Sequence, residues 1–272
     1  MGKLKRSIVV TSGKGGVGKT TITANVGTAL ALLNYQVVLV DADVGLRNLD
    51  LILGLENRIV FDLSDVIENR CRSYKQALIK DKRVGNLFLL PAPQTKQKED
   101  IPLDKFKELI EEIKQEFDFV IIDCPAGIEH GFKMSAKAAE EAIVVTTPDL
   151  SSIRDADRVI ANLEAMGKNS TKLIINRMKK HMVKKSQMLS IEDILETLNI
   201  ELLGIIPDDE YITISTNNGE PVVLNKTKPL YKYFNNIANR LVDPSIPIEN
   251  PFNEGNIFQK FASLVGLKKT KY

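Results

Sequence analysis

One glycine-rich segment, residues 13–20 (GKGGVGKT), constrains the fold of this 272-residue chain more than any other feature. It follows an apolar, β-branched run at residues 7–11 and precedes residues 20–35, whose apolar side chains recur at helical spacing. The pattern therefore predicts a tight connection from a strand to a helix. Glycines let backbone N–H groups converge there without Cβ clashes, beside the positive end of the helix dipole. The match to G-x-x-x-x-G-K-[ST] predicts a phosphate-binding loop.

The same motif assigns roles to individual side chains. We expect Lys19 to reach the outer phosphates and the hydroxyl of Thr20 to ligate Mg²⁺. The alternative, a strand–helix turn that binds nothing, is disfavoured because the whole motif is matched in the required context. The expected nucleotide contacts are Gly13, Gly15, Gly16, Val17, Gly18, Lys19, Thr20 and Thr21.

Short apolar runs recur along the chain and alternate with helical patterns. The runs occupy residues 7–11, 37–41, 87–91, 119–123, 143–147, 172–176 and 202–206, and helical spacing covers residues 20–35, 103–117, 190–199 and 230–241. Continuous apolar strands are typical of parallel sheets that are covered on both faces. The sequence predicts an α/β fold, a doubly wound, mostly parallel sheet of about seven or eight strands with helices on both faces.

Three aspartates stand at the ends of predicted strands, where parallel sheets bind ligands. Asp123 ends the run FVIID and has the pattern of a Walker-B aspartate, which holds Mg²⁺, usually through water. Asp41 and Asp43 end another strand, in VVLVDAD. We expect Asp41 to orient the attacking water and Asp43 to lie near the metal, on a loop that senses the γ-phosphate. A strand-terminal aspartate that merely caps the next turn is the alternative for each.

Composition narrows the class of protein. The two cysteines, Cys71 and Cys124, lack the spacing of a disulfide framework or a zinc site, which favours a reducing compartment. No apolar run approaches the ~20 residues that span a bilayer, and the apolar start leads directly into the glycine loop, as a first strand does. We therefore expect a soluble, cytoplasmic protein with its P-loop domain in residues 1–242.

The positive charge is concentrated at the C-terminus. Residues 257–272 contain four lysines and no acidic residue, which gives this segment a charge of +4. Since the whole chain has a net charge of +2, residues 1–256 have a net charge of −2. Residues 243–256, with three prolines, read as a linker. Beyond them a helix would gather an apolar stripe flanked by lysines, typical of an anchor on anionic lipid; a helix docked on its own domain is the alternative. The residues expected at the membrane are Ile257, Phe258, Phe261, Leu264, Val265, Lys268 and Lys269.

A second lysine within the loop, Lys14, resembles the signature lysine of the deviant Walker-A (MinD/ParA) family of P-loop ATPases. The resemblance implies ATP and Mg²⁺ as cofactors, and a homodimer closed over two nucleotides. Lys14 would then reach the partner's ATP, where a cation delivered in trans stabilises charge developing on the transferred phosphoryl. Without the resemblance, Lys14 could contact its own phosphates or solvent.

Further segments, among them GLRNLD (45–50), DCPAGIEHG (123–131) and SSIRDADR (151–158), resemble the septum-site-determining MinD branch. This resemblance covers essentially the whole chain. Cys124 is a departure, because relatives usually carry a small polar residue there. The resemblance implies that Asn176, Pro207 and Asp208 border the adenine. It also implies switch and partner positions at Asn48, Ser151, Ser152, Asp155 and Asp157, although plain helix capping fits the serines equally well.

The same branch implies a membrane switch on the inner face of the cell membrane, or a stromal setting in a plastid. ATP-driven pairing would bring two weak tails together, and hydrolysis would release them. A MinC-like inhibitor and a MinE-like activator are the implied partners. A DNA-segregation ATPase of the ParA type is the alternative, supported by the basic residues 177–185, although nucleic acid is not the expected partner. An iron–sulfur carrier of the nitrogenase type is remote with these two cysteines.

Overall fold

The computed structural model describes residues 4–94 and 101–252 of the chain. Its eight strands form one sheet in the order β3-β4-β2-β5-β1-β6-β7-β8. All neighbouring strands pair in parallel except β3 and β4, which are antiparallel. The strands are β1 (Arg6–Thr11), β2 (Val37–Asp41), β3 (Ile79–Lys80), β4 (Leu87–Leu90), β5 (Phe119–Asp123), β6 (Glu141–Thr146), β7 (Thr171–Met178) and β8 (Glu201–Pro207).

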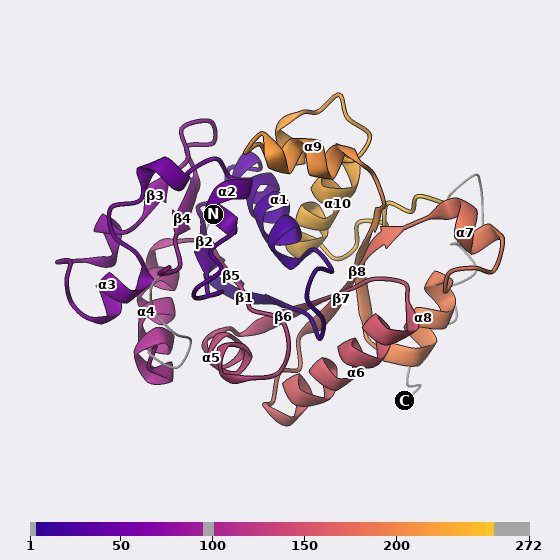
Figure 1. The fold of residues 1–272 in the computed structure, drawn as a ribbon, viewed down its shortest axis with the longest axis horizontal. Coiled ribbons are helices and arrows are strands. Elements are labelled where there is room, and N and C mark those ends of the chain that lie inside the picture. Colours follow the sequence, from indigo (N-terminus) through magenta and orange to yellow (C-terminus); the bar gives the residue numbers. More distant parts are fainter. Residues whose placement is uncertain (1–3, 95–100, 253–272) are drawn as a thin grey trace, which may run out of the picture.

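Helices cover both faces of this sheet, with α1, α2, α9 and α10 on one side and α4, α5, α6 and α8 on the other (Figure 1). The predicted doubly wound α/β architecture is thereby confirmed. The described helices are α1 (Lys19–Leu32), α2 (Leu49–Ile52), α3 (Leu63–Ile67), α4 (Leu103–Glu116), α5 (His130–Ala138), α6 (Leu150–Ala165), α7 (Lys180–Lys184), α8 (Ile191–Leu198), α9 (Tyr211–Asn217) and α10 (Tyr231–Val242).

The position of β1 in the centre of the sheet explains why its middle residues are all apolar. Ile8 and Val10 face the layer that contains α1 and α10, whereas Val9 between them faces the layer that contains α4 to α6. Because side chains alternate between the two faces of a strand, a strand covered on both sides has no solvent-facing position in its middle, and residues 8–10 are accordingly all apolar. The seven apolar runs all form strands, and the additional two-residue strand β3 is too short to produce a recognisable pattern.

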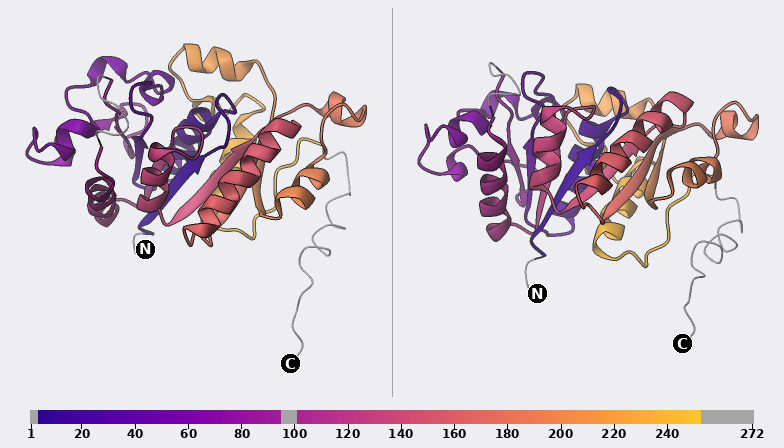
Figure 2. Two further views of the ribbon diagram at one scale, coloured as in Figure 1. Left: turned by 60° about the horizontal axis from the view of Figure 1, so that its bottom comes forward. Right: turned by 90° about the horizontal axis from the view of Figure 1, so that it is seen from below.

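The carboxyl ends of the parallel strands open on one end of the molecule. Figure 2 (right) shows the loop after β1 at the top and the N-terminus at the bottom, at opposite ends of that strand. In this strand order β1 lies between β5 and β6, and β2 lies on the other side of β5. The loops that follow β1, β2 and β5 therefore converge at the same end of the sheet, where ligands of such sheets bind.

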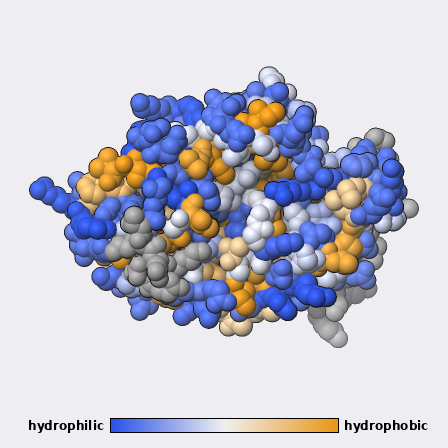
Figure 3. Space-filling model, viewed as in Figure 1, coloured by the Kyte–Doolittle hydropathy of each residue, from blue (hydrophilic) through white to orange (hydrophobic). Residues whose placement is uncertain are grey.

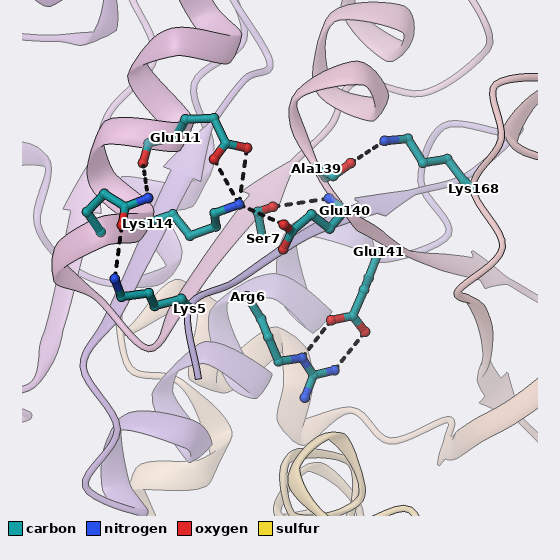
Figure 4. A network of polar contacts seen from close by, with 10 residues as sticks. Lys5, Arg6, Ser7, Glu111, Lys114, Ala139, Glu140, Glu141 and Lys168 are labelled. Atoms are coloured by element: carbon teal, nitrogen blue, oxygen red, sulfur yellow. Dashed lines mark hydrogen bonds and ion pairs between the residues drawn. The ribbon is translucent and has the colours of Figure 1, made fainter. Parts of the chain in front are cut away.

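The amino ends of the strands are fixed by a polar network instead (Figure 4). Arg6 on β1 makes a two-pronged ion pair with Glu141 on β6, with N–O distances of 2.6 and 2.7 Å. Lys114 of α4 donates to Glu140, 2.7 Å away, and Lys168 donates to the backbone oxygen of Ala139. Two-pronged guanidinium–carboxylate contacts fix geometry as well as energy. These contacts stabilise the end of the sheet at which the parallel strands begin. The candidate functional residues lie at the opposite end, where the strands finish.

The segment after α10 differs from the sequence prediction. Residues 243–252, the first part of the predicted linker, pack on the domain: Ile248 and Phe252 contact the apolar core. Asn236 of α10 donates to the backbone oxygen of Pro247 at 2.8 Å. The prediction rested on proline content, but prolines also suit a segment that lies along an edge without forming a ladder. We call residues 243–252 the C-terminal strap.

Candidate functional site

The glycine-rich loop adopts a conformation that its glycines make possible. Gly16 and Gly18 have positive φ angles of 76° and 101°, which side chains with a Cβ rarely adopt. A Cβ on Gly13 would lie 2.2 Å from the backbone oxygen of Asp155 in α6, so this position tolerates no side chain. The loop is therefore held close to α6 on one side while its N–H groups remain available.

The N-terminus of α1 follows this loop directly and provides an anion site. Gly18 is the N-cap residue of α1, and no side chain caps this end of the helix. The first turn of α1 contains no acidic residue. The first N–H groups of a helix have no partners within the helix, and the dipole is positive there. Lys19, the first residue of α1, is buried, with 8% of its surface exposed. An oxyanion of phosphate type fits this position.

Asp123 ends β5 directly beneath α1. Its carboxylate accepts a hydrogen bond from the hydroxyl of Thr23 at 3.2 Å and another from Thr20. Burial raises the pKa of Asp123 to about 6, although these hydroxyls and the charge of Lys19 act in the opposite direction. The structure thus brings the predicted magnesium residues Thr20 and Asp123 together.

Asp41 ends the neighbouring strand β2 and stands in register with Asp123. One carboxylate oxygen accepts the N–H of Asp43 at 3.0 Å, and the other accepts the N–H of Leu49 at 3.3 Å. Burial and then repulsion by Asp123 raise the pKa of Asp41 to about 8. A hydrogen-bonded, fully buried carboxyl with this pKa is suited to exchange a proton near neutral pH.

These residues fit a divalent cation bound together with a nucleotide. No group of three or more His, Cys, Asp and Glu side chains arranged to hold a metal occurs in residues 4–94 and 101–252. A magnesium ion held by one hydroxyl, one carboxylate, water and phosphate oxygens requires no such group. The crowded carboxylates Asp41 and Asp123 would also be stabilised by an added positive charge. Asp43, half-buried on the same loop, lies two residues from Asp41.

Lys14 points away from the chain's own phosphate site and contacts α6. Its ammonium donates to the hydroxyl of Ser151 at 2.8 Å and lies 3.8 Å from the carboxylate of Asp149. Burial alone would raise the pKa of Asp149, but hydrogen bonds from Thr147, Ser151 and Ser152 hold it well below its usual range. Lys14 is therefore half-exposed beside an ionised carboxylate. Its role in trans stays a prediction.

The predicted adenine residues lie in two connected places. The amide of Asn176 donates to the backbone oxygen of Val17 at 2.8 Å, which fastens the β7 end to the glycine loop. Pro207 and Asp208 line a cavity of about 360 Å³ at the ends of β7 and β8. Within it, Lys179 forms an ion pair with Asp208 at 3.3 Å. Met178, two residues after Asn176 in β7, also lines this cavity, so the segment fastened to the glycine loop continues into the cavity wall.

The predicted partner residues differ in accessibility. Asn48 and Ser151 are exposed, as is Asp157, whereas Asp155 packs against Gly13. Ser152 is buried, and its backbone N–H and hydroxyl bond within the α6 cap, whose N-cap residue is Asp149. Ser152 is therefore occupied by capping, the alternative that the sequence allowed.

Sequence reasoning missed Thr23 and Asp149. Thr23 lies one helical turn after Thr20, a spacing that places both hydroxyls on the side of α1 that faces Asp123, so the signal was present. Asp149 follows the β6 strand and was available as an N-cap residue. Cys124 is buried and its thiol donates to the backbone oxygen of Pro125, so this departure from the family pattern leaves the carboxylate of Asp123 unobstructed.

The face around the site carries exposed apolar side chains. Leu46 and Leu150, which follow β2 and β6, expose 65% and 76% of their surfaces. Figure 3 shows this face as mostly polar, with apolar groups interspersed. The predicted membrane residues of 257–272 lie outside the described residues. In the part of the chain that the structure describes, no helix has the length and apolar character needed to cross a bilayer.

A phosphate loop at the centre of a parallel sheet, with an aspartate at the end of the neighbouring strand, defines a P-loop nucleotide-binding protein. The chain belongs to the CobQ/CobB/MinD/ParA nucleotide binding domain family, whose model matches residues 8–222. This confirms the resemblance seen in the sequence.

Relatives in several organisms are similar over most of their length. The septum site-determining protein MinD of Synechocystis sp. is 54% identical over 245 residues, 90% of this chain and 92% of that protein. MinD in the MinC:MinD cell division protein complex of Aquifex aeolicus superposes with a TM-score of 0.84 at 51% identity, covering 90% and 99% of the two chains. MinD of Pyrococcus horikoshii, complexed with Mg-ADP, has a TM-score of 0.79 at 30% identity, with coverage of 88% and 97%.

Proposed function

We propose that this chain is a magnesium-dependent ATPase that serves in division-site placement as a dimerising membrane switch. The observation that carries the proposal is the assembly of Lys19, Thr20 and Asp123 around the uncapped N-terminus of α1, next to a second buried carboxyl, Asp41. The MinD relatives from Synechocystis and Aquifex support the cellular role, and the Mg-ADP complex of the Pyrococcus protein supports the cofactor.

The residues divide the chemistry between them. Lys19 and the N–H groups of the loop bind the phosphates and neutralise the charge that develops there. Thr20 and Asp123 would hold Mg²⁺, which would supply electrostatic stabilisation of the charge that develops on the phosphoryl group. Asp41 orients the attacking water, held in place by its two backbone N–H donors.

Dimerisation over ATP is supported by what lies exposed around the site. Leu46 and Leu150 present apolar surface on the face that contains the nucleotide loop. Lys14 is half-exposed on the same face, where a partner's phosphates would offer a stronger anion than the carboxylate of Asp149. A second copy that brought its own nucleotide would recruit Lys14 and cover the leucines. ATP therefore stabilises the pair, and hydrolysis weakens it.

Membrane attachment and partners complete the proposal. The basic, apolar-striped residues 257–272 act as a peripheral anchor on the inner face of the cell membrane, and two tails on one dimer bind far better than one. A MinC-like inhibitor binds the ATP dimer and a MinE-like activator triggers hydrolysis. Exposed Ser151 and Asp157 are candidate contacts for these partners.

Co-sedimentation with anionic liposomes tests the switch. The full chain should sediment with vesicles in a slowly hydrolysed ATP analogue and remain in the supernatant with ADP. Lys19→Ala should lose both nucleotide binding and sedimentation, because the phosphates lose their cation within the subunit. Near-normal ATP affinity in that variant would contradict the site. Salt-sensitive binding to duplex DNA without lipid binding would instead favour the DNA-segregation alternative.

A further inference from the structure

The C-terminal strap (residues 243–252) is clamped to the edge strand of the sheet by one buried arginine. Arg240 of α10 donates to the backbone oxygens of Leu202 and Leu203 in β8, at 3.3 and 2.9 Å. The same guanidinium donates to the backbone oxygens of Pro244 and Ile246 in the strap. Because all four acceptors are carbonyls and the arginine is nearly inaccessible, this contact fixes where the strap starts its course.

The strap then returns along α10 toward the end of the sheet that carries the functional site (Figure 2, right, yellow segment). Asn236 holds its middle at two points: its amide donates to the oxygen of Pro247 at 2.8 Å, and its carbonyl accepts the N–H of Glu249 at 2.9 Å. One turn earlier in α10, Lys232 pairs with the carboxylate of Glu249 at 2.7 Å. Successive turns of the helix thus guide successive residues of the strap.

The strap ends at the cavity that Pro207 and Asp208 line. Pro251 lines this cavity together with Tyr233 of α10 and with Pro207 and Asp208 at the end of β8. The remaining wall comes from the segment after β7, including Met178. The volume of about 360 Å³ is in the range of small-ligand pockets. Pro207, Pro251 and Tyr233 supply apolar surface that a purine base can contact, and the cavity's polar groups come from Lys179, Lys180, His181 and Asp208.

We propose that the C-terminal strap forms one wall of the pocket for the nucleotide base, and that Asn236 and Arg240 are positioning residues that hold Pro251 in that wall. The inference rests on the proposed function, because it requires a nucleotide whose phosphates occupy the loop after β1. Asn176 provides the continuity between the two places, since its amide bonds to the loop while its chain leads into the cavity wall.

This arrangement links the base to the C-terminal tail. The chain continues from the strap, residues 243–252, into the residues that are predicted to bind the membrane. The strap therefore connects the proposed base pocket to the C-terminal tail. A ligand that contacts the strap stabilises its docked position, and by reciprocity a docked strap raises affinity for that ligand. Only the base of the nucleotide contributes to this coupling with the strap, because the phosphates bind at the glycine-rich loop.

A pair of asparagine variants and a pair of ligands test the proposal. Asn236→Ala removes the two hydrogen bonds from Asn236 to the middle of the strap. The control Asn239→Ala removes a bond within α10, from its amide to the backbone oxygen of Asn235. Titration calorimetry on the full chain would measure the dissociation constants of Mg-ADP and of Mg-pyrophosphate, which lacks a base. We expect Asn236→Ala to weaken Mg-ADP about fivefold and to leave pyrophosphate unchanged, a size in keeping with lost pre-organisation. Asn239→Ala should change neither.

Hydrogen exchange and a second variant close the test. Mg-ADP, but not Mg-pyrophosphate, should slow exchange of the amides of Glu249 and Phe252. If Asn236→Ala does not fold, Pro251→Gly gives the same comparison without disturbing α10. Equal weakening of both ligands, or unchanged ADP affinity, would overturn the assignment of the strap to the base pocket. If the parental chain binds neither ligand, the proposed function fails, and the strap assignment falls with it.

Discussion

Replacing Asp41 with asparagine should change how the stability of the nucleotide-free protein depends on pH. The native carboxyl has a pKa of about 8, raised by burial and by repulsion from Asp123, against 3.8 for an ordinary aspartate. Between pH 6 and pH 8 the unfolded chain has therefore lost this proton while the native protein retains most of it. Because the native state binds more protons, its stability falls as the pH rises through this interval.

The size of the effect follows from the same values. One proton held over one pH unit is worth about 1.4 kcal/mol, and the native group is half ionised at pH 8, so Asp41 should cost the protein about 2 kcal/mol between pH 6 and pH 8. Asparagine removes this dependence. It retains one acceptor for the N–H of Asp43 or Leu49 but not both, which lowers stability by about 1–2 kcal/mol at every pH. The diagnostic quantity is thus the slope.

Urea denaturation at pH 6, 7 and 8, in a chelator and without nucleotide, measures this slope. The parental protein should lose stability with rising pH, and Asp41→Asn should lose much less. Asp193→Asn is a matched control: Asp193 caps α8, its pKa is lowered by hydrogen bonds from Ser190, and it is ionised in both states throughout this range. Identical slopes for the parental protein and Asp41→Asn would refute the description of Asp41 as a buried, proton-binding carboxyl.

Three further outcomes are expected. Gly13→Ala should reduce Mg-ADP affinity at least tenfold, since its Cβ would overlap the Asp155 backbone; calorimetry showing parental affinity would refute this close approach. Arg240→Met should lower the free energy of unfolding by about 2–4 kcal/mol, because buried carbonyls lose a charged donor, and an unchanged urea midpoint would contradict that. Deleting residues 257–272 should preserve the thermal midpoint and nucleotide affinity but abolish sedimentation with anionic vesicles; parental-level binding by the truncated chain would rule out the anchor.

The sequence by itself determined the elements and the class of site. Continuous apolar runs predicted strands buried on both faces, and β2 and β5 are buried along their whole length. These signals are local, because a strand or helix imposes its period on neighbouring residues. The phosphate loop was equally readable, since its glycines serve a backbone conformation that the motif itself encodes. Asp41 and Asp123 were also identified from a local signal, because each directly follows an apolar run that predicts a strand.

Only the tertiary structure brought those acids together. Asp41 and Asp123 are distant in the sequence and become neighbours because β5 inserts between β1 and β2, a strand order that no local pattern encodes. Their raised pKa values depend on that adjacency and on burial beneath α1. Electrostatic character is a property of the assembled environment, so the sequence could nominate the residues without predicting how strongly their pKa values shift.

The strap shows the same limit at the other end of the chain. The sequence predicted a linker here because of the prolines and polar residues. Such a composition indicates that a segment forms neither a helix nor a strand, but it does not indicate whether the segment packs on the domain. What holds it is a set of long-range contacts from Arg240 and Asn236 to backbone oxygens, and a carbonyl acceptor is present in every residue alike. Since such acceptors carry no sequence signature, only the folded arrangement of α10, β8 and the strap could decide that these residues reach the cavity.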